Sequence, residues 1–211
     1  MKKILIACEF SGVVRKAFEE IGWDAWSCDI LPTEQPGQHF QCDVRDVLNK
    51  GWDLMIGHPP CTYLTNVGAV HFHGKNRDKR IQLMKEGADF FNLLKNAPIN
   101  KICLENPVPI GLAKSLIGNY TQIIQPYEFN DDCIKRTCLW LKNLPKLKKT
   151  FLVPKVYRTS IVSSKTSIGG FRSAHERSRF SSGIAHAMAD QWGNDSFLYN
   201  QHLPNPWLTP K

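Results

Sequence analysis

The segment Asp53-Leu54-Met55-Ile56-Gly57-His58-Pro59-Pro60-Cys61-Thr62-Tyr63-Leu64 joins a short apolar run to two prolines and a cysteine. Proline has no N–H and a fixed φ, so the Pro-Pro pair ends strand pairing and stiffens the backbone that follows. The pattern predicts a strand over 52–56 whose carboxyl end, where open α/β sheets bind their ligands, holds the thiol of Cys61 in a defined place. The alternative is a turn followed by a buried cysteine, because free cysteine is among the most buried residue types.

The composition is that of a soluble globular protein. A chain of 211 residues suits a single domain with a sizeable core, and its 42% hydrophobic and 22% charged residues are ordinary values. No apolar run approaches the roughly 18 residues that span a bilayer. The apolar part of Met1–Ala7 breaks at Glu9, too early for a signal peptide, so we expect a cytoplasmic protein without a membrane partner.

The cysteines and the net charge further narrow the kinds of protein that this chain could be. The seven cysteines form no CxxC pair, which predicts reduced thiols rather than a disulfide framework. The net charge of +8 favours a polyanionic partner, most simply nucleic acid, with ordinary basic solubility as the alternative. His71 and His73 resemble half a metal site, but nothing near them completes a ligand set, so we expect no metal.

The N-terminal part predicts a strand, a glycine loop, a helix and a second strand. Ile4–Ala7 has the pattern of a buried strand, and Asp29 stands at the tip of the second strand, 24–28. The helix between them has one apolar stripe, made of Val13, Val14, Ala17, Phe18 and Ile21. This order is typical of a nucleotide site, where loop N–H groups face the ligand and the acid binds ribose hydroxyls; an ordinary βαβ unit is the alternative.

Two further acids occupy informative positions. Asp43 follows the short segment 40–42 and either contacts an adenine amine or caps the turn 43–46. Glu105 begins Glu105-Asn106-Pro107 at the end of a predicted strand, and is either a group for chemistry or a turn-forming acid. Helices are also predicted over 81–94, 112–117 and 183–192, and strands over 101–104, 121–124 and 137–141.

In this order the pieces resemble the DNA cytosine-5 methyltransferases. The matching pieces are Phe10-Ser11-Gly12 with its helix, Asp29, Asp43, Pro59-Pro60-Cys61, Glu105-Asn106, the strand entry with Arg136, and 183–192. The resemblance covers roughly Ile4 to Trp192, and its most specific elements are Pro-Pro-Cys and Glu-Asn, about 44 residues apart. The chain is most similar to the small phage- and prophage-borne members, which implies the cytoplasm of a bacterial host cell.

The resemblance implies an α/β, doubly wound, Rossmann-like S-adenosylmethionine-dependent methyltransferase fold, with a mostly parallel sheet and an antiparallel strand near one edge. It implies a catalytic domain over 1–193, with a reduced basic nucleic-acid-contacting insert at 142–180, and a C-terminal tail over 194–211. The implied cofactor is S-adenosylmethionine. The implied partner is DNA, with the target base flipped out of a duplex or taken from a single strand.

The resemblance also implies roles for individual residues. Cys61 would add as a thiolate, formed in an electropositive loop, to carbon 6 of cytosine, Glu105 would bind and protonate the ring, and Arg136 would orient the base. The expected cofactor-binding residues are Glu9, Phe10, Ser11, Gly12, Asp29, Ile30, Asp43, Val44 and Pro59. The expected substrate-binding residues are Pro60, Asn106, Lys135, Arg177 and Arg179.

The chain departs from the family pattern in three places. The first motif is altered to Glu9-Phe10-Ser11-Gly12 and follows Cys8, and Thr62 stands where the family commonly has glutamine. Only about 30 residues, 141–171, occupy the interval of the usual target recognition domain. We therefore expect low or short sequence specificity, or a helper protein.

These departures leave two alternatives to methylation of cytosine carbon 5 in DNA. The first is a related pyrimidine carbon-5 modifying enzyme that acts on a nucleotide or RNA, or that uses a modified S-adenosylmethionine donor. The second is a non-catalytic nucleic-acid-binding remnant, which would keep the basic stretch 142–179 and tolerate the loss of Cys61.

Overall fold

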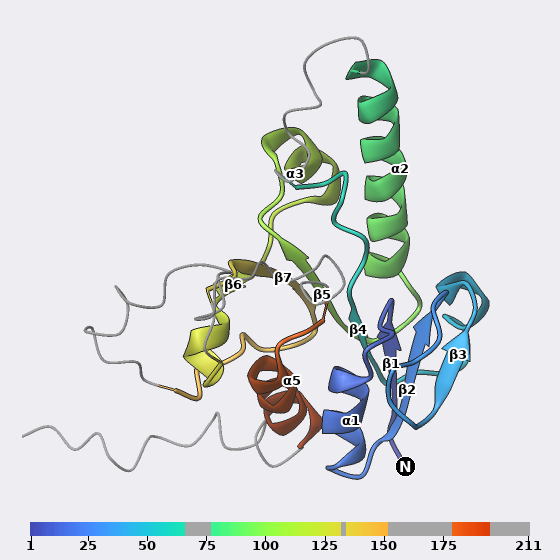
Figure 1. The fold of residues 1–211 in the computed structure, drawn as a ribbon, viewed down its shortest axis with the longest axis vertical. Coiled ribbons are helices and arrows are strands. Elements are labelled where there is room, and N and C mark those ends of the chain that lie inside the picture. Colours follow the sequence, from blue (N-terminus) through green and yellow to red (C-terminus); the bar gives the residue numbers. More distant parts are fainter. Residues whose placement is uncertain (66–76, 132–133, 152–178, 195–211) are drawn as a thin grey trace, which may run out of the picture.

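The computed structural model describes residues 1–65, 77–131, 134–151 and 179–194 of the chain (Figure 1). In these residues seven strands form one sheet in the order β3-β2-β1-β4-β5-β7-β6. The strands are β1 (Lys3–Ala7), β2 (Asp24–Asp29), β3 (His39–Gln41), β4 (Leu54–Gly57), β5 (Lys101–Pro107), β6 (Gln122–Ile124) and β7 (Thr137–Lys142). The fold class predicted from the sequence is confirmed: it is an α/β, Rossmann-like fold with a mostly parallel sheet and an antiparallel strand near one edge.

The strand order places the carboxyl ends of β1 and β4 next to each other near the centre of the sheet. Strands β1 to β5 run parallel to one another, whereas β7 runs antiparallel to both β5 and β6. The chain leaves β1 toward β2 and β3, and then returns to the other side of β1 with β4 and β5. The carboxyl ends of β1 and β4 therefore form the topological switch point, where sheets of this class bind ligands.

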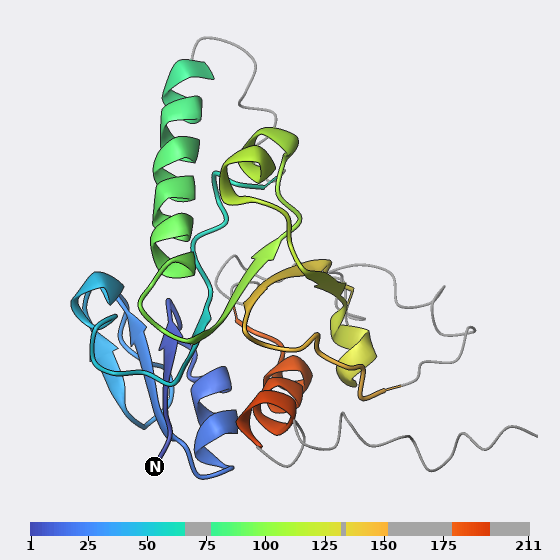
Figure 2. The ribbon, with the colours of Figure 1, turned by 180° about the vertical axis from the view of Figure 1, so that it is seen from behind.

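Helices cover both faces of the sheet. α1 (Val13–Glu19) and α5 (Ser182–Met188) share one hydrophobic cluster, and α5 continues into a π-helical turn, Ala189–Gly193. α2 (Arg77–Lys95) and α3 (Gly111–Ile117) pack side by side on the opposite face, as both views show (Figure 2). Two 3₁₀ turns, η1 (Val44–Asp46) and η3 (Pro126–Phe129), complete the described elements.

The central strands are apolar on both faces, which is what a parallel sheet covered by helices requires. Alternate residues belong to alternate clusters, so the face of each side chain follows from its position. Toward α1 and α5 lie Ile4, Ile6, Leu54, Ile56, Cys103 and Leu139. Toward α2 and α3 lie Leu5, Ala7, Met55, Ile102, Leu104 and Trp140.

The element bounds differ from the predicted ones in a few places. β5 runs to Pro107, so Glu105 and Asn106 lie inside the strand rather than after it, because β7 continues to pair with both of them. β4 begins at Leu54 rather than two residues earlier, and the side chain of Asp53 accepts a hydrogen bond from the Lys3 N–H at 2.7 Å. α2 begins at Arg77, and the last helix is α-helical only to Met188.

The start of α5 is held against the loop before β7. The carboxylate of Asp131 accepts hydrogen bonds from the Ser181 hydroxyl and, at 3.2 Å, from the Gly183 N–H. A Cβ at Gly183 would collide with the carbonyl oxygen of Phe129, so the approach requires glycine. Ser181 also caps the helix by accepting from the Ile184 N–H at 3.2 Å. These contacts fix the residues that immediately precede α5.

None of the helices in the described part of the chain is both long and apolar enough to cross a bilayer.

Candidate active site

The loop that carries Cys61 is fixed on the side of β4. The His58 N–H donates to the carbonyl of Ala7 at 2.9 Å, which ties the end of β4 to the end of β1. The Asn106 side-chain N–H donates to the carbonyl of Pro59 at 2.9 Å, which ties the Pro-Pro pair to β5. The prolines add their own stiffness. The backbone on the N-terminal side of Cys61 is therefore anchored to both neighbouring strands.

The C-terminal side of the same loop is held by α2 and by the segment after β5. Arg80 of α2 donates to the carbonyl of Thr62 at 2.7 Å, and its guanidinium lies 4.5 Å from the ring centroid of Tyr63. The Ile110 N–H donates to the Leu64 carbonyl at 2.9 Å. Both sides of the loop are thus tied to secondary structure, which restricts the backbone at Cys61.

The charge of Glu105 acts on the Cys61 thiol. Burial raises the pKa of the half-buried Cys61 thiol, the Glu105 charge raises it further, and the Lys135 charge opposes both. Burial also acts to raise the pKa of Glu105, but the hydrogen bond with His58 and the charges of Lys135 and His58 outweigh it and lower that pKa. The pair therefore holds one proton near neutral pH, on the sulfur of Cys61.

This balance differs from the expected electropositive loop. In the described residues the positive charge that favours a Cys61 thiolate is that of Lys135, and it does not overcome burial and Glu105. Among the described residues the balance therefore favours the thiol form of Cys61.

Three buried polar atoms at this edge of the sheet have no hydrogen-bond partner among the described residues. They are Glu105 Oε1, Asn106 Oδ1 and His58 Nε2. Glu105 and Asn106 are 7% and 1% exposed, and buried polar atoms in native proteins are nearly always paired. Unsatisfied atoms clustered beside a thiol are a physical indication of a polar ligand at this place.

The structure brings Lys135, and not Arg136, to the pair of Cys61 and Glu105. The Lys135 charge lowers the pKa of both, whereas the Arg136 charge acts on Cys138. Cys138 packs with the cluster under α2 and α3, on the face of β7 opposite Leu139, the residue paired with Glu105. Arg136 is exposed, and its catalytic role stays a prediction.

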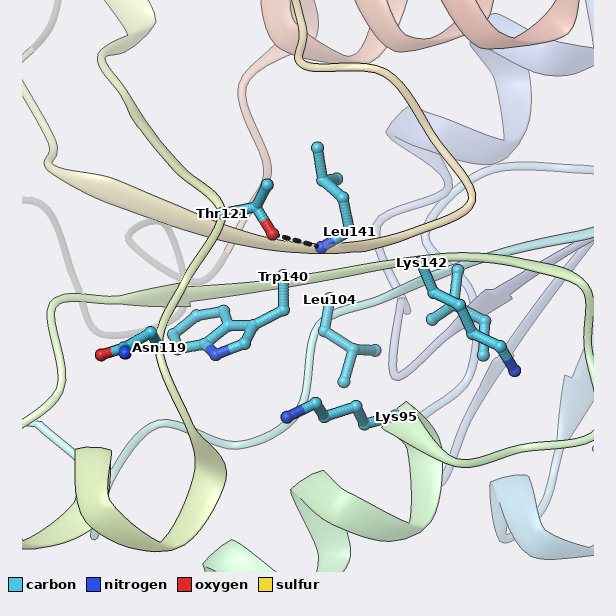
Figure 3. A pocket seen from close by; sticks show the side chains of 8 residues that line it. Lys95, Leu104, Asn119, Thr121, Trp140, Leu141 and Lys142 are labelled. Carbon is cyan, nitrogen blue, oxygen red and sulfur yellow. Dashed lines mark hydrogen bonds between the residues drawn. The ribbon is translucent and has the colours of Figure 1, made fainter.

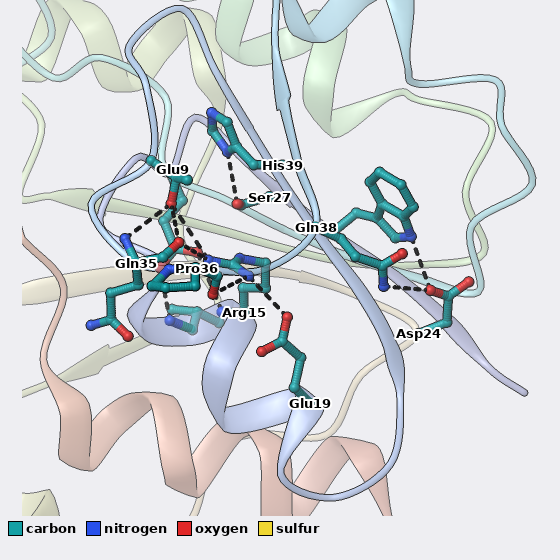
Figure 4. A network of polar contacts seen from close by, with 12 residues as sticks. Glu9, Arg15, Glu19, Asp24, Ser27, Gln35, Pro36, Gln38 and His39 are labelled. Carbon is teal, nitrogen blue, oxygen red and sulfur yellow. Dashed lines mark hydrogen bonds and ion pairs between the residues drawn. The ribbon is translucent and has the colours of Figure 1, made fainter.

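The glycine loop after β1 is built around the carboxylate of Glu9 (Figure 4). Glu9 Oε1 accepts from the Val14 N–H at 2.7 Å and from the Ser11 hydroxyl at 3.3 Å, and Oε2 accepts from the Arg15 N–H at 3.3 Å. Burial raises the pKa of Glu9, against the charge of His58 and these hydrogen bonds. Gly12 has a φ of +71°, which a side chain would strain, at the turn into α1.

A second loop lies over the glycine loop. The buried Arg15 side chain donates to the carbonyls of Gln35 and Pro36 at 2.8 and 3.1 Å, and pairs with Glu19 at 2.9 Å (Figure 4). The Glu34 N–H donates to the Phe10 carbonyl at 2.9 Å. The segment after β2 is thereby packed onto the predicted cofactor loop.

The remaining predicted cofactor residues lie at the ends of β2 and β3. Asp29 accepts from the Leu31 N–H at 2.9 Å, and Ile30 is 74% exposed beside it. Asp43 caps η1 by accepting from the Arg45 N–H at 2.9 Å, which agrees with the capping alternative. Val44 is buried in the core cluster under α2.

These residues fit S-adenosylmethionine better than a phosphate-bearing cofactor. A dinucleotide phosphate would need the free N–H groups at the start of α1, but the Glu9 carboxylate already accepts from two of them. S-Adenosylmethionine has no phosphate and carries positive charge on its sulfonium and amino groups. Asp29, at the tip of β2, would accept from a ribose hydroxyl, and the exposed Ile30 side chain would offer an apolar surface to a purine.

Of the predicted substrate residues, Pro60 is exposed and Asn106 is buried beside Glu105. Arg179 makes a bidentate ion pair with Glu34, at 2.9 and 3.0 Å, over the cofactor loop. Arg177 lies outside the described residues, as do His71 and His73. In the part of the chain that the structure describes, no three His, Cys, Asp or Glu side chains are grouped to hold a metal ion, and all six cysteines are free thiols.

Three residues at the site were not singled out from the sequence. His58 Nδ1 lies 3.4 Å from Glu105 Oε2, and the ring of Phe180 lies 4.6 Å from the His58 ring. Arg80 holds the cysteine loop. His58 had a usable signal, because it directly precedes Pro-Pro-Cys, whereas the approach of Phe180 depends on how the end of the chain returns to the sheet.

A pocket of about 110 Å³ lies elsewhere, between β5, β7 and the segment after α3 (Figure 3). Its polar side chains serve the chain itself: Lys95 donates to the Ile117 carbonyl at 2.8 Å, and Lys142 to the Ile99 carbonyl at 2.9 Å. The pocket is lined by Leu104 and Trp140, which face α2 and α3, whereas Glu105 faces the other side. It is separate from the site built around Cys61.

Comparison with known proteins finds likenesses among solved structures alone. No family model matches the chain, and no curated protein matches it. Among solved structures, the chain is similar to a prophage-encoded protein of E. coli described as a candidate DNA modification methyltransferase, with 15% sequence identity and a TM-score of 0.42. The match covers 67% of this chain and 46% of that one, so this chain spans less than half of that protein's length. A likeness at this level carries neither activity nor substrate from that protein to this chain.

Proposed function

We propose that the protein transfers a methyl group from S-adenosylmethionine to carbon 5 of cytosine in DNA, through a covalent adduct with Cys61. The observation that carries this proposal is the coupling of Cys61 and Glu105 at one sheet edge, with Glu105 Oε1 buried and unpaired among the described residues. A thiol that adds to a ring and an acid that serves the ring nitrogen are the two groups that this chemistry needs.

Carbon 5 of cytosine is too poor a nucleophile to be methylated unaided. In the proposed reaction the sulfur of Cys61 bonds to carbon 6, and the thiol proton passes through Glu105 to ring nitrogen 3. The electron pair of the carbon 5–carbon 6 bond then becomes available at carbon 5. Because Cys61 and Glu105 hold one proton between them, no other proton is required for this step.

S-Adenosylmethionine, when bound, supplies an electrophilic methyl group to carbon 5. After methylation, the carbon 5 proton leaves to solvent, the bond between sulfur and carbon 6 breaks, and the double bond reforms. The proton on nitrogen 3 returns through Glu105 to Cys61, which restores the starting state. Lys135 would stabilise negative charge on Cys61 or Glu105 while the proton is on the base, since its charge acts on both groups.

The groups proposed for S-adenosylmethionine are those at the ends of β1 and β2. The loop Glu9–Gly12 would shape the amino-acid end of the site, and Asp29 with Ile30 the adenosine end. Pro59 would help to hold the cofactor, and Asp43 and Val44 would border its site at η1. The proposed catalytic domain spans 1–193, with the basic nucleic-acid-contacting insert at 142–180, and the proposed C-terminal tail spans 194–211.

The net charge of +8 supports a polyanionic substrate. The short interval between β7 and α5 supports recognition of few bases, since it leaves no room for a separate reading domain. Arg136, Arg177 and Arg179 would contact DNA together with Lys135 and Pro60.

The test is product identification. The protein is incubated with S-adenosylmethionine that is labelled in its methyl group, and with duplex DNA, single-stranded DNA, RNA or dCMP in parallel. The polymers are then hydrolysed and the labelled base is identified. Label in 5-methylcytosine from DNA is the expected result. Label only from RNA or dCMP would replace the substrate in the proposal, and no label in any arm, with DNA still bound, would favour a binding protein without catalysis.

A further inference from the structure

His58 lies between the two buried carboxylates of the site. Gly57 pairs with Leu104 across β4 and β5, so the next residues, His58 and Glu105, stand side by side at the sheet edge. Their side chains are 13% and 8% exposed. The His58 charge also acts on Glu9, where it lowers the pKa against burial. The imidazole is therefore within electrostatic reach of both acids.

The hydrogen bond between His58 and Glu105 uses one oxygen of the carboxylate. His58 Nδ1 lies 3.4 Å from Oε2. A carboxylate only accepts, so Nδ1 carries the hydrogen and donates it. Oε1 remains buried with no partner in the described part of the chain. The two oxygens of Glu105 are thus unequal: one is engaged by the protein, and the other is left for a ligand.

His58 is held from two sides. Its backbone N–H donates to the Ala7 carbonyl at 2.9 Å, and the centroid of its ring lies 4.6 Å from that of Phe180, with an angle of 50° between the ring planes. Phe180 stands between Arg179, which is paired with Glu34, and Ser181, which caps α5. A ring fixed in this way directs Nδ1 at Glu105.

We propose that His58 is a positioning residue of the proposed reaction: its Nδ1–H holds Glu105 Oε2, so that Oε1 faces the pyrimidine ring nitrogen. This inference rests on the proposed function, which it deepens by assigning one oxygen to each task. When Glu105 has passed its proton to the base, the same N–H stabilises the carboxylate that remains. Among the described residues, the other ionisable groups that interact with the pair are Glu9, Cys61, Cys103, Cys138 and Lys135.

Two substitutions distinguish the effect of the His58 hydrogen-bond donor from that of its aromatic ring. His58→Asn keeps an N–H donor near the position of Nδ1 but loses the aromatic ring, whereas His58→Phe keeps a ring against Phe180 but loses the donor. We expect kcat to fall by about 100-fold in His58→Phe and by less than about 10-fold in His58→Asn, with the KM for DNA unchanged. An active Phe variant with an inactive Asn variant would show that His58 only fills space, and would overturn the proposal.

A second readout does not depend on activity. The carboxyl carbon of Glu105 is followed by NMR during a pH titration of the folded protein. The pKa of Glu105 should rise most in His58→Phe, which loses both the donor and the charge, and less in His58→Asn, which loses only the charge. His186→Phe, at an exposed histidine of α5, is the matched control without effect. An unchanged titration in His58→Phe would overturn the hydrogen bond. Wild-type protein that methylates nothing while the titration behaves as expected would instead overturn the proposed function, and the positioning role with it.

Discussion

Glu9 and Glu105 are two buried carboxylates beside the switch point of one sheet, and the protein treats them in opposite ways. Glu9 receives two backbone N–H groups and a hydroxyl from its own loop and helix. Glu105 receives one hydrogen bond, from His58, and its second oxygen has no partner among the described residues. The pKa of Glu9 is raised, chiefly by burial, whereas that of Glu105 is lowered because His58 and Lys135 outweigh burial.

The difference teaches how to tell a structural acid from a chemical one. Glu9 fills the N-terminus of α1 and shapes the loop, so its carboxylate is used up by the fold. Glu105 is kept ionised and is left with one oxygen for a ligand, next to a thiol whose pKa it raises. Burial alone does not distinguish them, since both side chains are almost completely covered; the hydrogen-bond partners do.

The comparison predicts its largest effect on turnover at Glu105. Glu105→Gln removes the group that passes the proton to the ring, so methylation should fall by about 10²- to 10⁴-fold. The free energy of unfolding should change far less, because one hydrogen bond to His58 can be kept. Methylation assays and urea unfolding measure the two quantities, with Glu86→Gln on the exposed side of α2 as the control for charge. Full turnover in Glu105→Gln would place the acid elsewhere.

The opposite pattern is expected at Glu9. Glu9→Gln sets an amide N–H against one of the backbone N–H groups at the start of α1, which leaves a buried donor unpaired. The free energy of unfolding should fall by about 1–3 kcal/mol in urea denaturation. Per folded molecule, turnover at saturating cofactor should remain. A variant that keeps its stability but loses turnover would reverse the roles given to the two acids.

The pH dependence of stability should separate the same two residues. Glu105 has a lowered pKa in the folded protein, so its contribution is present above its ordinary value of 4.5 and is lost as the pH falls through the folded value. Glu9 has a raised pKa, so its contribution is present below 4.5 and is lost as the pH rises through the folded value. Compared with Glu105→Gln, the free energy of unfolding of the wild-type protein should therefore fall as the pH is lowered. Compared with Glu9→Gln, it should rise as the pH is lowered. Parallel urea titrations that show the same sign for both would contradict the comparison.

The smallest effect is expected at the ion pair over the cofactor loop. Glu34→Gln should cost less than about 1 kcal/mol, because the Arg179 side chain is 48% exposed and surface pairs contribute little. Arg179→Gln should in addition weaken DNA binding and reduce its salt dependence, because it removes a cation. Binding measured at several salt concentrations checks this. If both variants bind DNA with the same affinity and the same salt dependence, Arg179 contributes to the fold and not to DNA binding.

The sequence predicted the parts of the site that depend on strand ends. The apolar run followed by Pro-Pro placed Cys61, and the run 101–104 placed Glu105 at the same edge, because parallel strands end together. A doubly wound, mostly parallel sheet with an antiparallel strand near one edge followed from the resemblance, and the structure confirms this fold class.

Three features of the site were not accessible in this way. The bonding of Glu9 to its own helix depends on the path of an irregular loop. The choice of Lys135 over Arg136 depends on the register of β7 against β5, which a slip of one residue would reverse. The place of Phe180 over His58 depends on Gly183 and Asp131, which join distant parts of the chain.

The most direct test of the central claim is covalent trapping. An oligonucleotide in which the target cytosine is replaced by 5-fluorocytosine cannot lose the carbon 5 substituent as a proton, so an enzyme that adds a thiol to carbon 6 stays attached. With S-adenosylmethionine present, we expect an adduct that survives denaturation and whose peptide map places the attachment on Cys61. The Cys61→Ser variant should form none. Tight DNA binding without an adduct, or an adduct that persists in Cys61→Ser, would contradict the account.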